Sequence, residues 1–182
     1  SVNSLLVIVK DAATGTAIEG ATVSLHKNSP ATDYTGTTGG SVWQQTDWSS
    51  GAGQTDWANH SQYLTDDNNV NVITIPDGVR LASAGSSYVA SGWLESSTFD
   101  TGASSNFTTI TWQPTSQNPA TTLKFQLASN NDNLTWNYIG PDGTASTYYT
   151  VSGSNISASH DNNRYVRYKV FESTTDTTFT PV

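Results

Sequence analysis

The sequence predicts an all-β fold arranged as a β-sandwich, and three observations lead to this prediction. Short runs with the two-residue alternation of β-strands recur along the 182 residues. No run sustains the 3.6-residue period of an α-helix. Turn-forming clusters, such as those at 77–78, 118–119 and 140–143, separate the runs at short intervals. Many short strands joined in this way are typical of sandwiches and barrels, in which inner faces supply the core.

In chain order, six expected strands are runs rich in apolar, β-branched and aromatic residues, at 5–9, 21–26, 70–75, 88–94, 108–112 and 134–139. Two more runs alternate most clearly. The run 123–127 places its apolar residues on one face and its polar residues on the other. In 164–170, Tyr168 and two valines are expected to point inward, while Arg167 and Lys169 are expected to face water.

The stretch 36–61 shows little alternation and contains five Gly and three Trp. It predicts a joint between two modules, the first covering 1–46 and the second 47–182. Within the joint, Gln-Thr-Asp-Trp at 45–48 recurs at 54–57, which we interpret as a local duplication because a solenoid would repeat along the whole chain.

Charge and composition exclude several classes of partner. The formal net charge is -8 with seven Lys and Arg, so there is no basic surface for nucleic acid or acidic lipid. Cysteine is absent, which excludes disulfides, thiolate zinc sites and thiol nucleophiles. The longest apolar run, 5–9, is far shorter than the roughly 20 residues that span a bilayer. These features favour an extracellular protein with no membrane insertion.

Catalytic residues are not expected. The three histidines, His26, His60 and His160, lie at a strand end or in polar loops and are interpreted as ordinary surface imidazoles. No Gly-x-Ser-x-Gly motif is present, and the His residues lack the spacing of a zinc site. The sequence therefore predicts a protein that is not an enzyme and carries no cofactor.

Carboxylates offer two weaker possibilities. Glu95, Asp100 and Asp161 could take part in glycoside chemistry if two of them lay roughly 5–10 Å apart across a cleft, but such residues equally hold turns. The loops 66–69 and 130–133 offer oxygen ligands for calcium without the spacing of an EF-hand. Both loops are expected to be Asx turns, and no metal ligand is assigned.

Residues 5–25 contain a strand, an Asp-x-x-Thr-Gly turn, Gly-Ala and a second strand, with the turn formed by Asp11, Thr14 and Gly15. This stretch resembles the opening of carboxypeptidase-regulatory-like and Cna-B-type β-domains. The resemblance implies a small module of immunoglobulin or prealbumin type, which in secreted and surface proteins usually serves as a stalk or spacer.

A second resemblance rests on 91–102, 110–112, 123–126, Trp136 and 164–168. Through these segments, residues 88–182 resemble jelly-roll modules of large bacterial surface or pilin-associated proteins, similar in style to discoidin-like and galactose-binding-like sandwiches. This resemblance implies a jelly-roll-like sandwich and a location at the cell surface. Members of such families commonly continue with another strand after the segment that matches 180–182.

Tryptophans suggest a possible glycan site. Trp48 and Trp57 each follow an Asp in the Gly-rich joint, where flat aromatic faces with nearby amides could bind sugar. They could equally fill the interface between the two modules, because bulky aromatic residues dominate buried contacts. Trp112 and Trp136 lie in strand-like contexts and are expected in the core.

Taken together, these features predict a non-enzymatic structural protein of the cell surface, such as a pilus-like filament subunit, with carbohydrate binding or adhesion as the alternative. Partners would be further copies, other surface proteins or glycans. Self-association is expected through strand addition, with the apolar segment Leu5, Leu6, Val7, Ile8 and Val9 completing a sheet in the next subunit. The alternative is that this segment begins the first module's own sheet.

Overall fold

The computed structural model divides the chain into two compact units, 1–43 and 44–182. The residues that it describes are 22–25, 34–37, 45, 48, 63–72 and 78–181. In the first unit, β1 (Thr22–Leu25) and β2 (Tyr34–Thr37) form an antiparallel pair, and β1 lies within the predicted strand 21–26. The family identities of the two modules stay a prediction.

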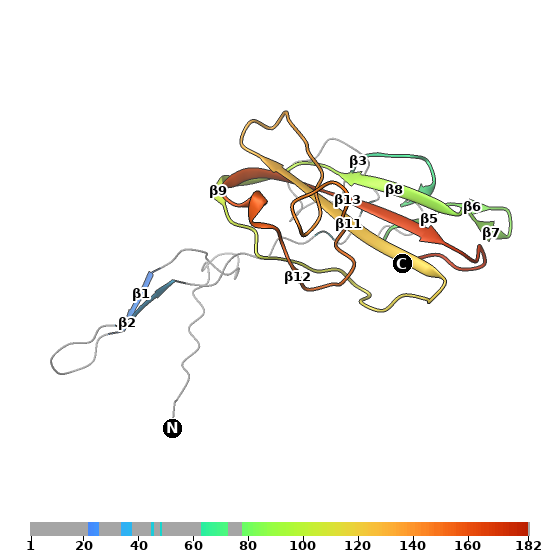
Figure 1. The fold of residues 1–182 in the computed structure, drawn as a ribbon, viewed down its shortest axis with the longest axis horizontal. Helices are drawn as coiled ribbons and strands as arrows, with labels where there is room; N and C mark the ends of the chain where they lie inside the picture. The colour runs from blue at the N-terminus through green and yellow to red at the C-terminus, as the bar shows by residue number, and fades with distance from the viewer. Residues whose placement is uncertain are drawn as a thin grey trace, which may run out of the picture. The chain divides into compact units, whose positions relative to one another are not determined.

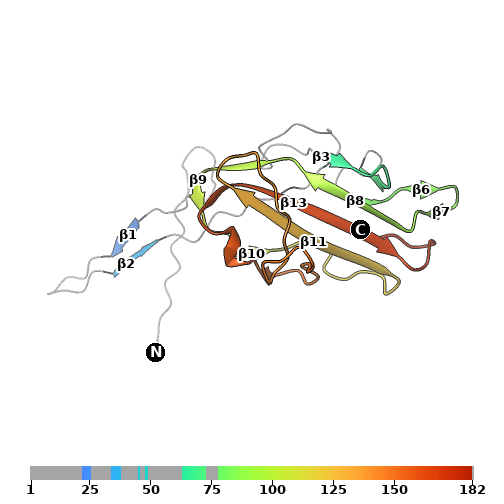
Figure 2. The same cartoon turned by 45° about the horizontal axis from the view of Figure 1, so that its top comes forward.

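The second unit is built on a five-stranded antiparallel sheet, shown in Figures 1 and 2. Its strand order is β11-β13-β8-β3, with β9 also paired to β13. The bounds are Tyr63–Asp66 for β3, Ser91–Ser96 for β8, Phe99–Ser105 for β9, Thr121–Asn130 for β11 and Asn163–Thr174 for β13. The long strands β11 and β13 contain the two runs that alternate most clearly in the sequence, and both predicted strands are confirmed.

Three short antiparallel pairs accompany this sheet: β4 (Val70–Asn71) with β5 (Arg80–Leu81), β6 (Ser83–Ala84) with β7 (Ser87–Tyr88), and β10 (Thr109–Ile110) with β12 (Ser154–Asn155). The described residues contain one helical turn, the 3-10 helix η1 (Ala158–His160). The all-β prediction is confirmed, and the jelly-roll arrangement stays a prediction. Across the described residues, no helix has the length and hydropathy that a bilayer-spanning segment needs.

The core lies against one face of the sheet, which we name the inner face. Its buried cluster consists of Val72, Val79, Leu94 and Val170. Half-buried rings pack around this cluster, including Trp48, Phe125 and Tyr168. Trp112 is partly buried and lies against Phe125, with ring centroids 4.6 Å apart. Full burial of a side chain such as Leu94 stabilises the fold by roughly 1.5–3 kcal/mol.

Strand β11 forms one edge of the sheet, and the chain that follows β11 forms backbone hydrogen bonds to this edge at two points. Phe125 and Tyr149 exchange two backbone hydrogen bonds of 2.9 Å, and Leu127 and Ile139 exchange bonds of 3.1 and 2.8 Å. The predicted strand 134–139 is therefore wrong apart from this single bridge at Ile139. The reason is local, because an Asp132 carboxylate oxygen accepts the backbone N–H groups of residues 134 and 135, which a strand would need for its ladder.

Other predicted strands differ at their ends. The expected strand 88–94 is interrupted, because the Tyr88 N–H bonds to the carbonyl of Thr177 and β8 begins only at Ser91. Strand β9 was not predicted, since 102–105 carries no apolar alternation. The described C-terminal segment is docked: Pro181 is buried, and the Thr180 hydroxyl accepts the backbone N–H of Leu81 at 2.9 Å.

Candidate functional site

The outer face of the sheet, opposite the core, carries polar and aromatic residues in transverse rows. Each row takes one residue from β11, β13 and β8, and the three rows are Thr122, Ser173 and Ser91; Lys124, Phe171 and Trp93; Gln126, Lys169 and Glu95. Residues that are directly opposite each other on neighbouring strands point to the same face of the sheet. The three rows share this face because they are two residues apart along each strand. The outer face therefore passes from hydroxyls, through aromatic rings, to charged groups.

Arg167 follows the third row and is largely covered. Its side chain is 14% exposed, and its Nη1 lies 3.0 Å from Glu95 Oε1. Its Nε donates to the Thr98 hydroxyl at 2.8 Å, and its guanidinium lies 3.9 Å from the ring centroid of Trp136. The expectation that Arg167 faces water is wrong, because the loop that follows β11 folds back over this face. Trp136 accordingly packs on the outer face and not in the core.

Lys169 is surrounded by aromatic rings. Its Nζ lies 3.6 Å from the ring centroid of Trp93, 5.7 Å from Tyr138 and 5.9 Å from Phe171. Such cation–π contacts each stabilise by about 0.5–2 kcal/mol. Burial raises the pKa of Tyr138, and the nearby Glu95 carboxylate adds to the shift. Lys169 lies on the outer face, as expected, but it is partly buried among these rings.

Beyond this covered part, the first two rows form an open groove of about 200 Å³. The residues that line it are Asp67, Ser91, Gly92, Trp93, Lys124, Phe171, Glu172 and Ser173. Lys124 reaches over a neighbouring ring, with Nζ 3.9 Å from the centroid of Tyr148. The groove thus combines two aromatic rings, which we name its floor, with two hydroxyls, one ammonium and the acidic residues Asp67 and Glu172. Sequence reasoning missed it because its residues come from three strands distant in the chain.

Glu172 is among the residues that line the groove, but its place in the alternation of β13 puts its side chain on the inner face. It is 2% exposed, and neither carboxyl oxygen has a hydrogen-bond partner among the described residues. Burial raises its pKa to about 8. The signal was present in the sequence, because continuing the alternation of Val166 and Val170 by two residues places Glu172 inside.

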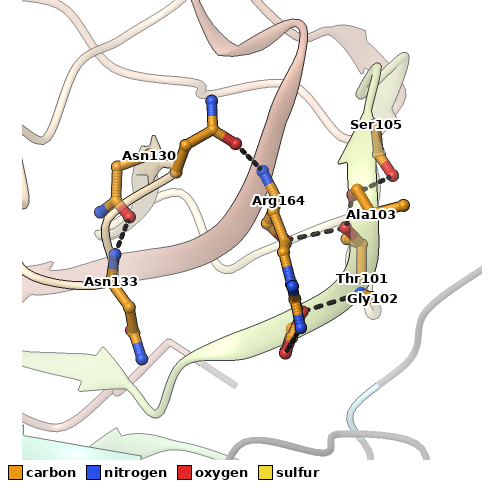
Figure 3. Close-up of polar contacts among 9 residues, drawn as sticks. Thr101, Gly102, Ala103, Ser105, Asn130, Asn133 and Arg164 are labelled. Carbon is orange, nitrogen blue, oxygen red and sulfur yellow. Dashed lines mark hydrogen bonds and ion pairs between the residues drawn. The ribbon is translucent and has the colours of Figure 1, made fainter.

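A polar cluster occupies the end of the sheet where β13 begins. Arg164 forms a bidentate ion pair with Asp100, with N–O distances of 2.7 and 2.8 Å. Its backbone N–H bonds to the Asn131 side chain, and its carbonyl accepts the Thr101 hydroxyl. Figure 3 shows Arg164 between strand β9 and the loop 130–133. The hydrogen bond and charge of Arg164 lower the pKa of Asp100.

The acidic loops are Asx turns, as predicted. Asp67 Oδ1 accepts the backbone N–H groups of Asn69 and Trp93, at 3.0 and 3.2 Å. Asp132 binds backbone donors in the same way, which lowers its pKa. Within the described ranges, no group of three or more His, Cys, Asp or Glu side chains could hold a metal ion.

His160 is buried and not a surface imidazole, so this prediction is wrong. It is 2% exposed, and its Nδ1 lies 2.8 Å from the Ser129 hydroxyl, which also accepts the Asn163 amide. Burial lowers its pKa to about 4. The polar residues around it suggested exposure, whereas the packing of η1 against β11 encloses it.

Of the two tryptophans predicted to bind sugar, the structure describes Trp48. It is half-buried, and its indole N–H donates to the Tyr168 hydroxyl at 2.6 Å. The Tyr168 hydroxyl in turn donates to the Gln45 side chain at 2.7 Å. Trp57, the predicted assembly strand 5–9, His26 and His60 lie outside the described residues.

Comparison of the chain with protein-family models, curated proteins and solved structures found no match.

Proposed function

We propose that this chain is a non-enzymatic structural protein of the extracellular cell surface, such as a pilus-like filament subunit, that associates with itself or with other surface proteins through β-strand contacts. Two lines support the proposal. Both modules resemble parts of bacterial surface proteins in sequence, and the carboxylates of Glu95 and Asp100 are engaged in holding the fold of the second unit.

The observation that carries the proposal is that Glu95 and Asp100 each form an ion pair with an arginine. Both are carboxylates that the sequence offers for acid–base chemistry, and each is bonded to an arginine of β13. Glu95 joins β8 to Arg167, and Asp100 joins β9 to Arg164. These pairs tie neighbouring strands of the sheet together, which is a structural use of the two groups.

Hydrolase profiling of the full chain tests the non-enzymatic role. We expect no specific turnover of esters, glycosides or peptides. Turnover that disappears in Glu95→Gln, Asp100→Asn or Asp161→Asn would overturn the proposal. Electron microscopy of native material provides the complementary measurement, since a structural subunit should occur in filaments or on a larger surface assembly.

Strand addition is the proposed mode of assembly, with 5–9 as the donated strand. Strand β3 offers an acceptor edge in the second unit: it pairs with β8 on one side, and no described residue pairs with it on the other. Leu64, at 37% exposure, adds an apolar side chain to this edge. Unpaired strand edges are sites where another chain can add a strand.

Deletion of 1–9 tests this mode. The truncated chain should stay soluble and lose assembly, and Val7→Asp should have the same effect because it places a charge in the donated strand. Native-like assemblies from the truncated chain, or a full-length chain that stays monomeric at high concentration, would contradict strand donation.

Carbohydrate binding or adhesion is the second candidate function, and the aromatic composition of the outer face favours it. A glycan array with Trp48→Ala and Trp57→Ala tests the residues that the sequence singles out. Saccharide binding that is lost in both variants would favour this function over a purely structural one.

A further inference from the structure

We propose that the groove on the outer face binds a uronic acid residue of an extracellular polysaccharide. This goes beyond the structural role proposed above, which does not depend on it. The inference rests on the floor of the groove, on its hydroxyl rim and on the charge of Lys124.

The floor is formed by Trp93 and Phe171, which lie opposite each other on β8 and β13. Lys169 contacts the Trp93 ring from the row on the covered side. One face of a pyranose is lined with C–H groups, and electron-rich aromatic faces accept such groups favourably.

The rim supplies groups that match sugar hydroxyls. Ser91 is exposed and Ser173 half-exposed, and they lie opposite each other beside the aromatic floor. Each hydroxyl can donate one hydrogen bond and accept two, as the hydroxyls of a sugar also do. An apolar floor with a few polar groups at its border is the usual composition of a small-ligand site.

The charge of Lys124 selects an acidic sugar. Arg164 and Arg167 each have a carboxylate partner, whereas Lys124 forms no ion pair with any described residue and lines the groove. Its ammonium lies 6.0 Å from the centroid of Phe171, beside the floor. A uronate stacked on the floor could extend its carboxylate to this ammonium in a charge-assisted hydrogen bond.

Asp67 does not prevent this placement. It borders the groove near Trp93 on β8, while Lys124 lies on β11, two strand spacings away, or about 10 Å. At physiological ionic strength this distance is close to the Debye length of about 8 Å, so repulsion is screened. The Oδ1 of Asp67 is also occupied by two backbone donors.

The size of the groove limits the ligand to one ring. Its volume of about 200 Å³ is below the roughly 300–1,000 Å³ of pockets that enclose drug-sized ligands. A single residue within an open chain fits this space, because the neighbouring residues of the polysaccharide can extend over the exposed end of the sheet.

The test is calorimetric titration of the full chain with an oligomer of galacturonic acid, its uncharged methyl ester and polyglutamate. We expect the uronate oligomer to bind at least tenfold more tightly than the ester and than polyglutamate. Lys124→Gln should reduce the preference over the ester to near parity. An equally tight ester would overturn the role of Lys124, and equally tight polyglutamate would overturn saccharide recognition.

Two variants locate the site. Trp93→Ala removes the floor, and Ser91→Tyr fills the groove from an exposed strand position without removing a core contact. Both should weaken uronate binding at least tenfold, whereas Phe179→Ala, which removes an exposed aromatic ring that does not line the groove, should leave it unchanged. Absence of uronate binding, or wild-type binding by Ser91→Tyr, would overturn the proposal and leave the structural role unaffected.

Discussion

Replacement of Glu172 by Gln should remove the fall in unfolding free energy that this carboxyl group contributes between about pH 5 and pH 8. The carboxyl group of Glu172 is 2% exposed, and burial raises its pKa from 4.5 in water to about 8 in the folded chain. The unfolded chain releases this proton above about pH 4.5, while the folded chain keeps it up to about pH 8. Folding must therefore oppose ionisation throughout that interval.

The sign and magnitude follow from proton linkage. Because the folded-state pKa is raised, the stability is fully present below the unfolded-state pKa and is lost as the pH rises toward the folded-state value. Each pH unit in that interval costs about 1.4 kcal/mol, so Glu172 by itself should lower the free energy of unfolding by about 3 kcal/mol between pH 4.5 and pH 7. Above about pH 8 both states are ionised and the loss stops.

Urea denaturation at several pH values between 4.5 and 8.5, followed by tryptophan fluorescence, measures this effect. The free energy of unfolding of the wild type relative to Glu172→Gln should fall by about 3 kcal/mol between pH 4.5 and pH 7, because His160 contributes equally to both proteins. Glu172→Leu is a second variant with no ionisable group, and it should be at least as stable as Glu172→Gln because it leaves no unpaired polar atom in the core. Parallel pH profiles for wild type and Glu172→Gln would refute the reasoning.

Three further outcomes are expected. Glu95→Gln should destabilise the second unit by about 3 kcal/mol, because it leaves the largely buried Arg167 without its carboxylate, and a double-mutant cycle in urea measures the coupling. Asp100→Asn should cost less than about 1 kcal/mol in the same assay, since the ion pair with Arg164 is 31–42% exposed and screened by water. Burial lowers the pKa of His160 from 6.5 to about 4, so its contribution to stability should be present above pH 6.5 and be lost as the pH falls toward 4. His160→Gln should reduce this loss of unfolding free energy between pH 6.5 and pH 4, and an unchanged loss would contradict the assignment.

The long strands could be predicted because their signal is local. The alternation in β11 and β13 reports which side chains share a face, and the structure confirms both strands. The same signal does not report what covers each face. Arg167 and Lys169 alternate with apolar residues as solvent-facing residues do, yet Trp136 of the loop after β11 covers Arg167 and Trp93 of β8 contacts Lys169.

The errors of prediction have the same origin. The run 134–139 has the composition of a strand, but the Asp132 carboxylate binds two of its backbone donors and the run forms a single bridge. His160 stands among polar residues, and its burial arises from packing against β11. The groove likewise depends on the register between three strands, which no local pattern specifies. Only Glu172 could have been located from the alternation itself.

The loop that covers the outer face also affects how copies of the protein approach one another. Its Trp136 covers the guanidinium of Arg167, and the Glu95 carboxylate beside this guanidinium neutralises the charge that it would present to distant molecules. Asp132, Asp142 and Asp176 stand in exposed turns, where hydrogen bonds lower their pKa and keep them ionised in mildly acidic media. Copies should therefore repel one another at long range in dilute buffer, and added electrolyte should accelerate their association by screening that repulsion.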